Sequence, residues 1–235
     1  MTRRLAFGAG AVAVVAGYRW FVQPWHQSWG ATSTEVTLAL PGDELTAPPA
    51  EQTTRAITID APAERIWPWL VQLGADRGGF YSYDWLEDLF GLHIHSAGTV
   101  VQEWQRLEVG DVVYADRARR GGWLVVELVP GRTLVMKVAD LESGRPIDRD
   151  EGIGWEFQWT FSLQPGDEGR TRLLVRERVG FGRRTTRWLM APVGLVSFAM
   201  TRRMLLGIKR RAEASSRETV EAGQTDRVSV GRAWP

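Results

Sequence analysis

Two neighbouring segments of the chain alternate between apolar and polar side chains, and no other feature constrains the fold as much. Residues 155–163 and 171–179 both repeat with a period of two, and the sequence Pro165-Gly-Asp-Glu-Gly169 lies between them. This period is typical of strands with one buried face, and a turn rich in Pro and Gly between two strands predicts an antiparallel hairpin. The apolar face of the first segment consists of Trp155, Phe157, Trp159, Phe161 and Leu163. We therefore expect a sheet with an aromatic inner face.

Periodicity and turn residues elsewhere predict an α+β domain. We expect strands at residues 55–60, 100–104, 111–116, 123–129 and 133–138, and a short edge strand at residues 35–40. We expect helices at residues 63–73, 83–90 and 192–215. The last helix is amphipathic, so it should dock across the sheet rather than span a bilayer.

Composition excludes several classes of protein. The chain of 235 residues contains no cysteine, which rules out disulfides, thiol catalysis and iron–sulfur clusters. Its 29 basic and 28 acidic residues nearly balance, but eight basic residues and no acid lie between Arg183 and Arg211. We expect this basic segment to face solvent or phospholipid headgroups. No nucleic-acid-binding motif accompanies it, so no nucleic-acid partner is expected.

The N-terminus resembles a membrane segment. Residues 5–18 carry no charge, and interfacial aromatic residues, including Trp20 and Trp25, follow them. A retained single-pass anchor is favoured, while a cleaved signal peptide and a soluble apolar tail stay open. The arginines flanking the apolar segment favour an extracytoplasmic domain. We expect an anchor at residues 1–22, an extended linker at 23–53, a folded domain at 54–215 and a polar, disordered tail at 216–235.

Four stretches of sequence carry a resemblance to a known superfamily: residues 57–70, with an Ala-Pro followed by Ile-Trp, and residues 77–87, 103–111 and 204–213. Residues 54–215 resemble the START/Bet v 1-like (SRPBCC) superfamily, which includes polyketide cyclase/dehydrase and lipid transport proteins, and within it a membrane-anchored bacterial branch. The resemblance implies a helix-grip fold: a curved antiparallel sheet of about six to seven strands wrapped around a long C-terminal helix. It also implies a cavity between sheet and helix, but not one particular function.

Glu177 stands where the alternation calls for an apolar side chain. A buried carboxylate is costly unless it is paired or protonated. It could bind a ligand hydroxyl, act as an acid or base, pair with an internal arginine such as Arg77, or reach water at the rim of the sheet. On the opposite face of the sheet, Glu156 should form an exposed pair with Arg176 or Arg178.

We expect a membrane-anchored protein that binds or transfers a hydrophobic small molecule, such as a lipid, an isoprenoid or a polyketide-like compound. The residues expected to contact it are Tyr81, Tyr83, Trp85, Trp104, Trp123, Trp155, Trp159 and Glu177. A cyclase or dehydratase that uses Glu177 and Tyr83 is the alternative, and a protein-interaction module is the third. No cofactor is expected, and no metal, because His93 and His95 lack further ligands. The sequence leaves the oligomeric state open.

Overall fold

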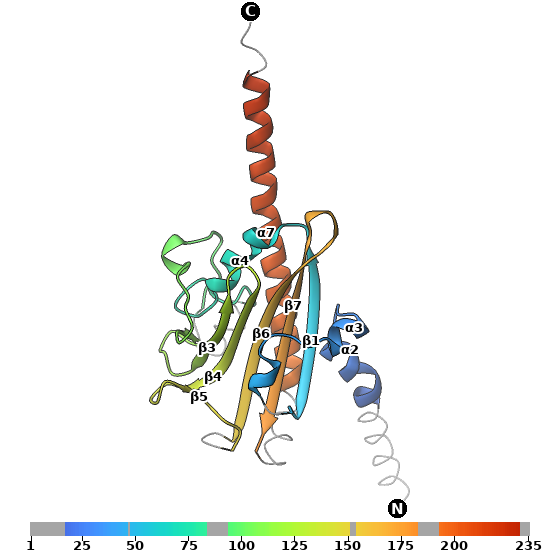
Figure 1. Cartoon of the computed structure of the whole chain (residues 1–235), viewed down its shortest axis with the longest axis vertical. Helices are drawn as coiled ribbons and strands as arrows, with labels where there is room; N and C mark the ends of the chain where they lie inside the picture. Colours follow the sequence, from blue (N-terminus) through green and yellow to red (C-terminus); the bar gives the residue numbers. More distant parts are fainter. Residues whose placement is uncertain (1–16, 47, 84–93, 151–153, 183–192, 231–235) are drawn as a thin grey trace, which may run out of the picture.

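The protein is a curved antiparallel sheet packed against a long C-terminal helix, α7 (Val193–Val230) (Figure 1). The computed structural model describes residues 17–46, 48–83, 94–150, 154–182 and 193–230, with side chains described as far as residue 214. This arrangement confirms the predicted α+β architecture.

The seven-stranded sheet has the order β1-β7-β6-β4-β3-β2, with the short β5 paired to β4. The strands are β1 (Glu51–Ile59), β2 (Val112–Tyr114), β3 (Gly122–Val129), β4 (Thr133–Asp140), β5 (Arg145–Pro146), β6 (Trp155–Pro165) and β7 (Thr171–Phe181). The predicted hairpin is present as β6 and β7, which pair along their whole length. Because β1 pairs with β7, the first strand of the chain lies beside the last.

Short helices make up most of the remaining regular structure. They are the π-helix η1 (Tyr18–Val22), α2 (Gln23–Gln27), α3 (Ser33–Thr37), α4 (Ala63–Val71) and the 3-10 helices η2 (Asp43–Leu45), η3 (Gln102–Trp104) and η4 (Asp167–Gly169). The helix predicted at residues 63–73 corresponds to α4, whereas the one predicted at residues 83–90 lies almost wholly outside the described residues.

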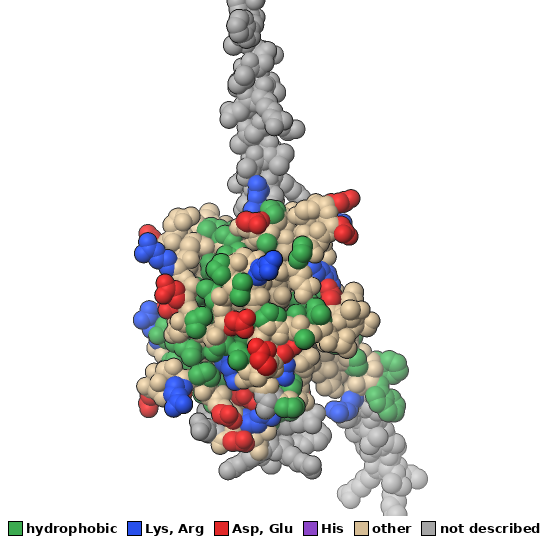
Figure 2. Space-filling view, in the orientation of Figure 1, with side chains coloured by type: hydrophobic (Ala, Val, Ile, Leu, Met, Phe, Trp, Pro, Cys, Tyr) green, Lys and Arg blue, Asp and Glu red, His purple; other side chains and the backbone are tan. Residues whose placement is uncertain are grey.

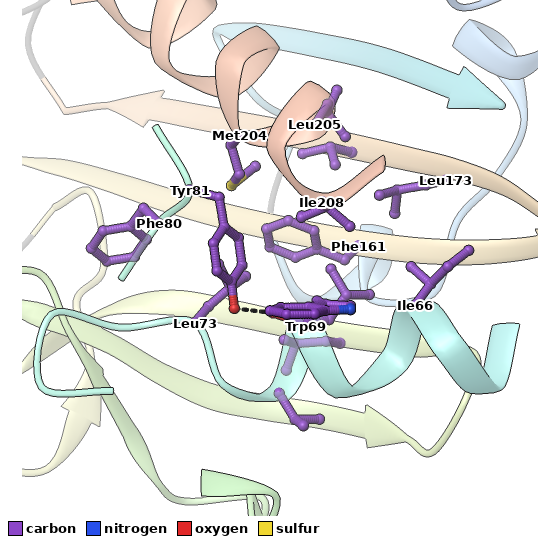
Figure 3. Close-up of a cluster of buried hydrophobic side chains, with 14 of the residues drawn as sticks. Ile66, Trp69, Leu73, Phe80, Tyr81, Phe161, Leu173, Met204, Leu205 and Ile208 are labelled. Carbon is purple, nitrogen blue, oxygen red and sulfur yellow. Dashed lines mark hydrogen bonds between the residues drawn. The ribbon is translucent and has the colours of Figure 1, made fainter. Parts of the chain in front are cut away.

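The main core lies between α4, α7 and one face of the sheet (Figure 3). Helix α4 contributes Ile66 and Trp69, and α7 contributes Met204 and Ile208, all of them buried. Leu205 and Ala212 of α7 are buried as well. Helix α7 therefore docks across the sheet through one apolar stripe, as its periodicity predicts.

The strand predicted at residues 100–104 is wrong, because this segment leads into the 3-10 helix η3. The side chain of Gln72 accepts a hydrogen bond from the Val101 amide at 3.2 Å and donates one to the Thr99 carbonyl at 3.2 Å. Gln105 donates to the Val101 carbonyl at 3.2 Å. Glutamine side chains thus satisfy backbone groups that a neighbouring strand would otherwise have to pair.

The edge strand predicted at residues 35–40 is also wrong, because residues 33–37 form the helix α3. Thr32 and Glu35 form a capping box: each side chain accepts a hydrogen bond from the backbone amide of the other residue, at 3.2 and 2.7 Å. The Thr-x-x-Glu signature of this motif was present in the sequence. It outweighed the short apolar alternation.

The segment expected as an extended linker instead folds onto the outer face of the sheet, the face opposite α7. Arg176 of β7 is fully buried there and donates hydrogen bonds to the carbonyls of Glu35, Val36 and Leu38. Asp43 pairs with Arg176 and Arg178. This covering also corrects the expectation for this face, because arginines expected in solvent are buried beneath residues 30–46.

Glu156 on the same outer face does not form the expected exposed pair with Arg176 or Arg178. It is buried and pairs with Lys137 and Arg149. The neighbouring arginines are unavailable to it because Asp43, from the N-terminal segment, holds both.

Both ends of the chain differ from the sequence-based expectation. Helix α7 continues to Val230, through most of the tail predicted to be disordered, and projects beyond the sheet (Figure 1). Within the described residues, no helix combines the length and apolar character needed to cross a bilayer. Residues 1–16, which hold most of the predicted anchor, lie outside the described residues.

Candidate functional site

Glu177 is the centre of a buried polar network between β7 and α7. Its side chain is 6% exposed and accepts a hydrogen bond from Arg55 Nη1 at 2.8 Å. Two hydroxyls of α7 also donate to the carboxylate: Thr201 at 2.7 Å and Ser197 at 2.8 Å. Thr53, the cross-strand neighbour of Glu177 on β1, donates a longer bond of 3.4 Å.

The network bears on two of the alternatives that the sequence leaves open for Glu177, the exposure of its side chain and its arginine partner. The side chain is buried, so it does not reach water at the rim. It pairs with an internal arginine, but the partner is Arg55 and not Arg77, whose guanidinium donates to the carbonyls of Val71 and Arg106. Alternation along residues 55–60 places Arg55 on the inner face, but its pairing with Glu177 depends on the register of β1 against β7.

The environment of Glu177 favours the ionised form. Burial by itself raises the pKa of this carboxyl, but the charge of Arg55 and the hydrogen bonds from Thr201, Ser197 and Arg55 together hold the pKa below its ordinary value. A carboxylate with donors on both oxygens and a lowered pKa is a poor general base. The geometry therefore favours a structural role for Glu177 over a catalytic one.

Arg55 connects this network to the N-terminal helices. Its side chain is 1% exposed, its Nε donates to the His26 carbonyl at 3.0 Å, and its guanidinium lies 5.5 Å from the centroid of the Phe198 ring. His26 is buried, and burial followed by the nearby charge of Arg55 lowers the pKa of its imidazole. The pair Arg55–Glu177 thus joins α2, the sheet and α7.

A continuous row of aromatic rings lies beside Glu177 on the inner face. Trp159 is the cross-strand neighbour of Glu177, and its ring lies 5.0 Å from Phe161 and 5.4 Å from Trp123, centroid to centroid. Phe80 stacks on Trp159 at 6.4 Å, and Phe157 meets it edge-on at 6.2 Å. We call these five rings, together with Trp155 beside Phe157, the aromatic row.

The aromatic row runs from the centre of the core to its edge. Phe161 is fully buried and Trp159 is 8% exposed, whereas Trp123, Phe157 and Trp155 are half-buried. The indole nitrogen of Trp159 is buried and has no hydrogen-bond partner among the described residues. A buried N–H group without a partner costs about 1–3 kcal/mol, so this position favours an additional hydrogen-bond acceptor.

The remaining predicted contact residues lie in different surroundings. Trp104 is half-buried in η3, and Trp85 lies outside the described residues. Tyr81 is buried in the core, where its hydroxyl donates to the Trp69 carbonyl at 3.1 Å (Figure 3). Burial raises the pKa of Tyr81, so its hydroxyl stays protonated. Tyr83 is half-buried beneath Arg203 of α7.

The described residues form a pocket of about 240 Å³, but its walls are not those expected from the sequence. Its walls are Tyr81, Ser82, Tyr83, Ser96, Arg203, Arg210 and Arg211. Tyr81 and Tyr83 were predicted contact residues, whereas the two serines and three arginines were not. Neither Glu177 nor the tryptophans of the aromatic row belong to these walls, so the pocket does not bring Glu177 and Tyr83 together.

The described residues contain no group of three or more His, Cys, Asp or Glu side chains that could hold a metal ion. His93 lies outside the described residues, so the pair His93 and His95 cannot be assessed together.

The fold and its contents define a class of protein: an α+β domain in which an antiparallel sheet and a long helix enclose an aromatic interior. Comparison with known protein families finds no match for the sequence, and no curated protein matches it.

Several solved structures are similar in fold at low sequence identity. A Nitrosomonas europaea protein is 15% identical with a TM-score of 0.42, and the match covers 70% of this chain and 95% of that protein. The Aha1 dimer from Colwellia psychrerythraea is 16% identical with a TM-score of 0.37, over 68% of this chain and 93% of that one. DynU16, described as a putative protein in the dynemicin biosynthetic locus, is 16% identical with a TM-score of 0.40, over 67% of this chain and 46% of its own.

Proposed function

We propose that this protein is a START/Bet v 1-like, membrane-associated binding protein for a hydrophobic small molecule, which contacts the aromatic row. The observation that carries the proposal is the indole nitrogen of Trp159, which is buried among aromatic rings and has no hydrogen-bond partner in the described part of the chain. A ligand with an apolar body and one acceptor atom would contact the rings and accept this hydrogen bond.

The chemistry of the row indicates the class of ligand. Rings with half-buried outer members offer faces and edges to a flat or extended apolar molecule, and burial contributes roughly 25 cal/mol per Å² of apolar surface removed from water. A lipid, an isoprenoid or a polyketide-like compound has both the required apolar area and an oxygen acceptor. Binding is favoured over catalysis because the carboxylate of Glu177 is already saturated with donors.

Exposed apolar side chains at the N-terminal helices support the membrane part of the proposal. Trp20 and Phe21 are 74% and 76% exposed, and Trp25 is largely exposed beside them. Leu195 and Val196, near the start of α7, are exposed too. Figure 2 shows hydrophobic side chains gathered at the lower right, over the N-terminal helices. Aromatic side chains of this kind favour the membrane interface, and the apolar residues 5–18 lead directly into them.

Native mass spectrometry of the full chain, extracted in mild detergent, tests the ligand proposal. The wild type should carry a co-purifying hydrophobic molecule. Trp159→Phe should bind it about fivefold more weakly, because one hydrogen bond of about 1 kcal/mol is lost. Trp67→Phe is the matched control, since Trp67 packs against the core from α4 and is not in the aromatic row. A wild type without ligand in every preparation, or equal retention by Trp159→Phe, contradicts the proposal.

A further inference from the structure

The pocket between α7 and the turn at Tyr81–Tyr83 is lined by several positive charges. Three arginines, Arg203, Arg210 and Arg211, line it, and none of the described residues in its walls is acidic. Its volume of about 240 Å³ corresponds to roughly eight water molecules. The pocket is therefore a cationic site large enough for a small polar group.

Two of these arginines have no partner for their charge within the described structure. No hydrogen bond or ion pair from the described residues reaches the guanidinium group of Arg203 or Arg210. The Nε atom of Arg203 is buried as well. The guanidinium carbon of Arg203 lies 5.5 Å from the centroid of the Tyr83 ring. Arg203 is thus a half-buried cation without a counter-charge among the described residues, which favours an anion from outside.

The buried arginines of this fold differ from the half-buried and exposed arginines of the pocket. Arg55 pairs with Glu177, and Arg176 pairs with Asp43. Arg172, which is only partly buried, also pairs with a carboxylate, that of Glu35. On both faces of the sheet, these arginines thus form ion pairs with Asp or Glu side chains. The described residues of the pocket wall include no Asp or Glu.

The walls of the pocket are held in place before any ligand arrives. Arg211 donates from Nε to the Ala97 carbonyl at 2.8 Å, and its guanidinium lies 4.8 Å from the ring centroid of Tyr81. Gly207 brings α7 against the turn, because a Cβ atom there would lie 2.6 Å from the Tyr81 carbonyl oxygen. Preorganised walls of this kind reduce the entropic cost of binding.

We propose that this pocket binds a phosphate-type oxyanion. A cluster of guanidinium groups matches the charge and the several acceptor oxygens of a phosphate group better than it matches a single acceptor. Ser82 and Ser96 add hydroxyl groups to the same wall. The phosphate group belongs either to a soluble phosphomonoester or to the headgroup of an anionic lipid. Binding at the pocket does not depend on occupancy of the aromatic row, which has separate walls.

The test compares variants of the full-length protein in detergent, titrated with inorganic phosphate and followed by calorimetry. Arg203→Gln/Arg210→Gln should bind phosphate at least about tenfold more weakly than the wild type, because two charge-assisted contacts are lost. Arg202→Gln is the control: it removes the same charge from the same helix, but Arg202 is exposed and stacks on Trp29 outside the pocket. Arg210→Gln alone, a change of an exposed side chain, should already weaken binding without affecting the fold.

Vesicles separate the two sources of the phosphate group. Binding is compared on phosphatidylcholine vesicles with and without phosphatidic acid. A gain with phosphatidic acid that is lost in Arg203→Gln/Arg210→Gln assigns the pocket to a lipid headgroup; phosphate binding without this gain assigns it to a soluble phosphomonoester. Equal phosphate affinity in wild type and double variant, or absence of binding to both phosphate and phosphatidic acid, overturns the proposal. Neither result bears on hydrophobic ligands at the aromatic row.

Discussion

Replacing Glu177 by glutamine is the most informative single change that the structure offers. The substitution keeps the shape of the side chain but leaves the charge of Arg55, 1% exposed, without a counter-charge in the core. Removing one partner of a buried ion pair costs about 3–5 kcal/mol, because the remaining charge stays desolvated. At about 2–4 °C per kcal/mol for a domain of this size, Tm should fall by roughly 6–20 °C.

A double replacement isolates the electrostatic cause. In Arg55→Met/Glu177→Leu both charges are absent, and apolar side chains fill the space. Such replacements are often neutral or stabilising. The hydroxyls of Ser197 and Thr201 can then bond to carbonyls of their own helix. We expect the double variant to recover at least half of the stability that Glu177→Gln loses.

Denaturant unfolding followed by tryptophan fluorescence measures these differences in the free energy of unfolding. The single variants Arg55→Met and Glu177→Leu complete the double-mutant cycle. For a hydrogen-bonded buried pair we expect a coupling energy of about 2 kcal/mol or more, near the upper end of pairwise terms. If Glu177→Gln costs less than about 1 kcal/mol, or if the double variant loses the sum of the losses in Arg55→Met and Glu177→Leu, the ion pair does not stabilise the core.

Three further results are expected. Gly207→Ala should destabilise the protein by about 1–3 kcal/mol, because the added methyl group meets backbone, whereas Gly194→Ala in the same helix meets nothing within 4 Å and should be neutral or stabilising; thermal melts of both variants check this. Asp43→Asn removes the shared partner of two arginines and should speed hydrogen exchange across residues 30–46, while Glu168→Gln, which breaks an exposed pair, should not; equal exchange in both would refute the covering role of this segment. Hydrogen bonds from an arginine lower the pKa of Glu35 from 4.5 to about 2, so its stabilisation is complete above pH 4.5, is lost as the pH falls towards 2, and should be missing from the pH profile of Glu35→Gln.

The inner face of the sheet could be predicted from the sequence because alternation is a local property. The period of two places Trp155, Phe157, Trp159 and Phe161 on one side of β6. Glu177 stands out because it interrupts the corresponding apolar alternation of β7. Its partner could not be found in the same way. Arg55 lies more than a hundred residues earlier in the chain, and pairing it with Glu177 requires the register of β1 against β7.

The arginines show a second limit of local patterns. The basic segment between Arg183 and Arg211 is evident in the sequence, but amphipathicity alone assigns it to solvent or headgroups. In the structure its basic side chains have different partners. Arg202 stacks on Trp29, Lys209 donates a hydrogen bond to the Thr58 carbonyl, and Arg203 lines the pocket. These neighbours come from distant parts of the chain. The burial of Arg176 was missed for the same reason, because the segment that covers it was expected to be extended.

The attachment of the N-terminal segment also fixes a distance. Fully extended, residues 23–53 would let the domain move up to about 100 Å from its point of attachment. Instead, Arg55 binds the carbonyl of His26, and the Ala56 amide binds the carbonyl of Trp29 at 3.1 Å. The chain is therefore fixed to β1 within a few residues of the exposed aromatic side chains at residues 20–25. Whatever surface holds those side chains also holds β1, and through it the sheet, at a separation set by folded contacts instead of by chain length.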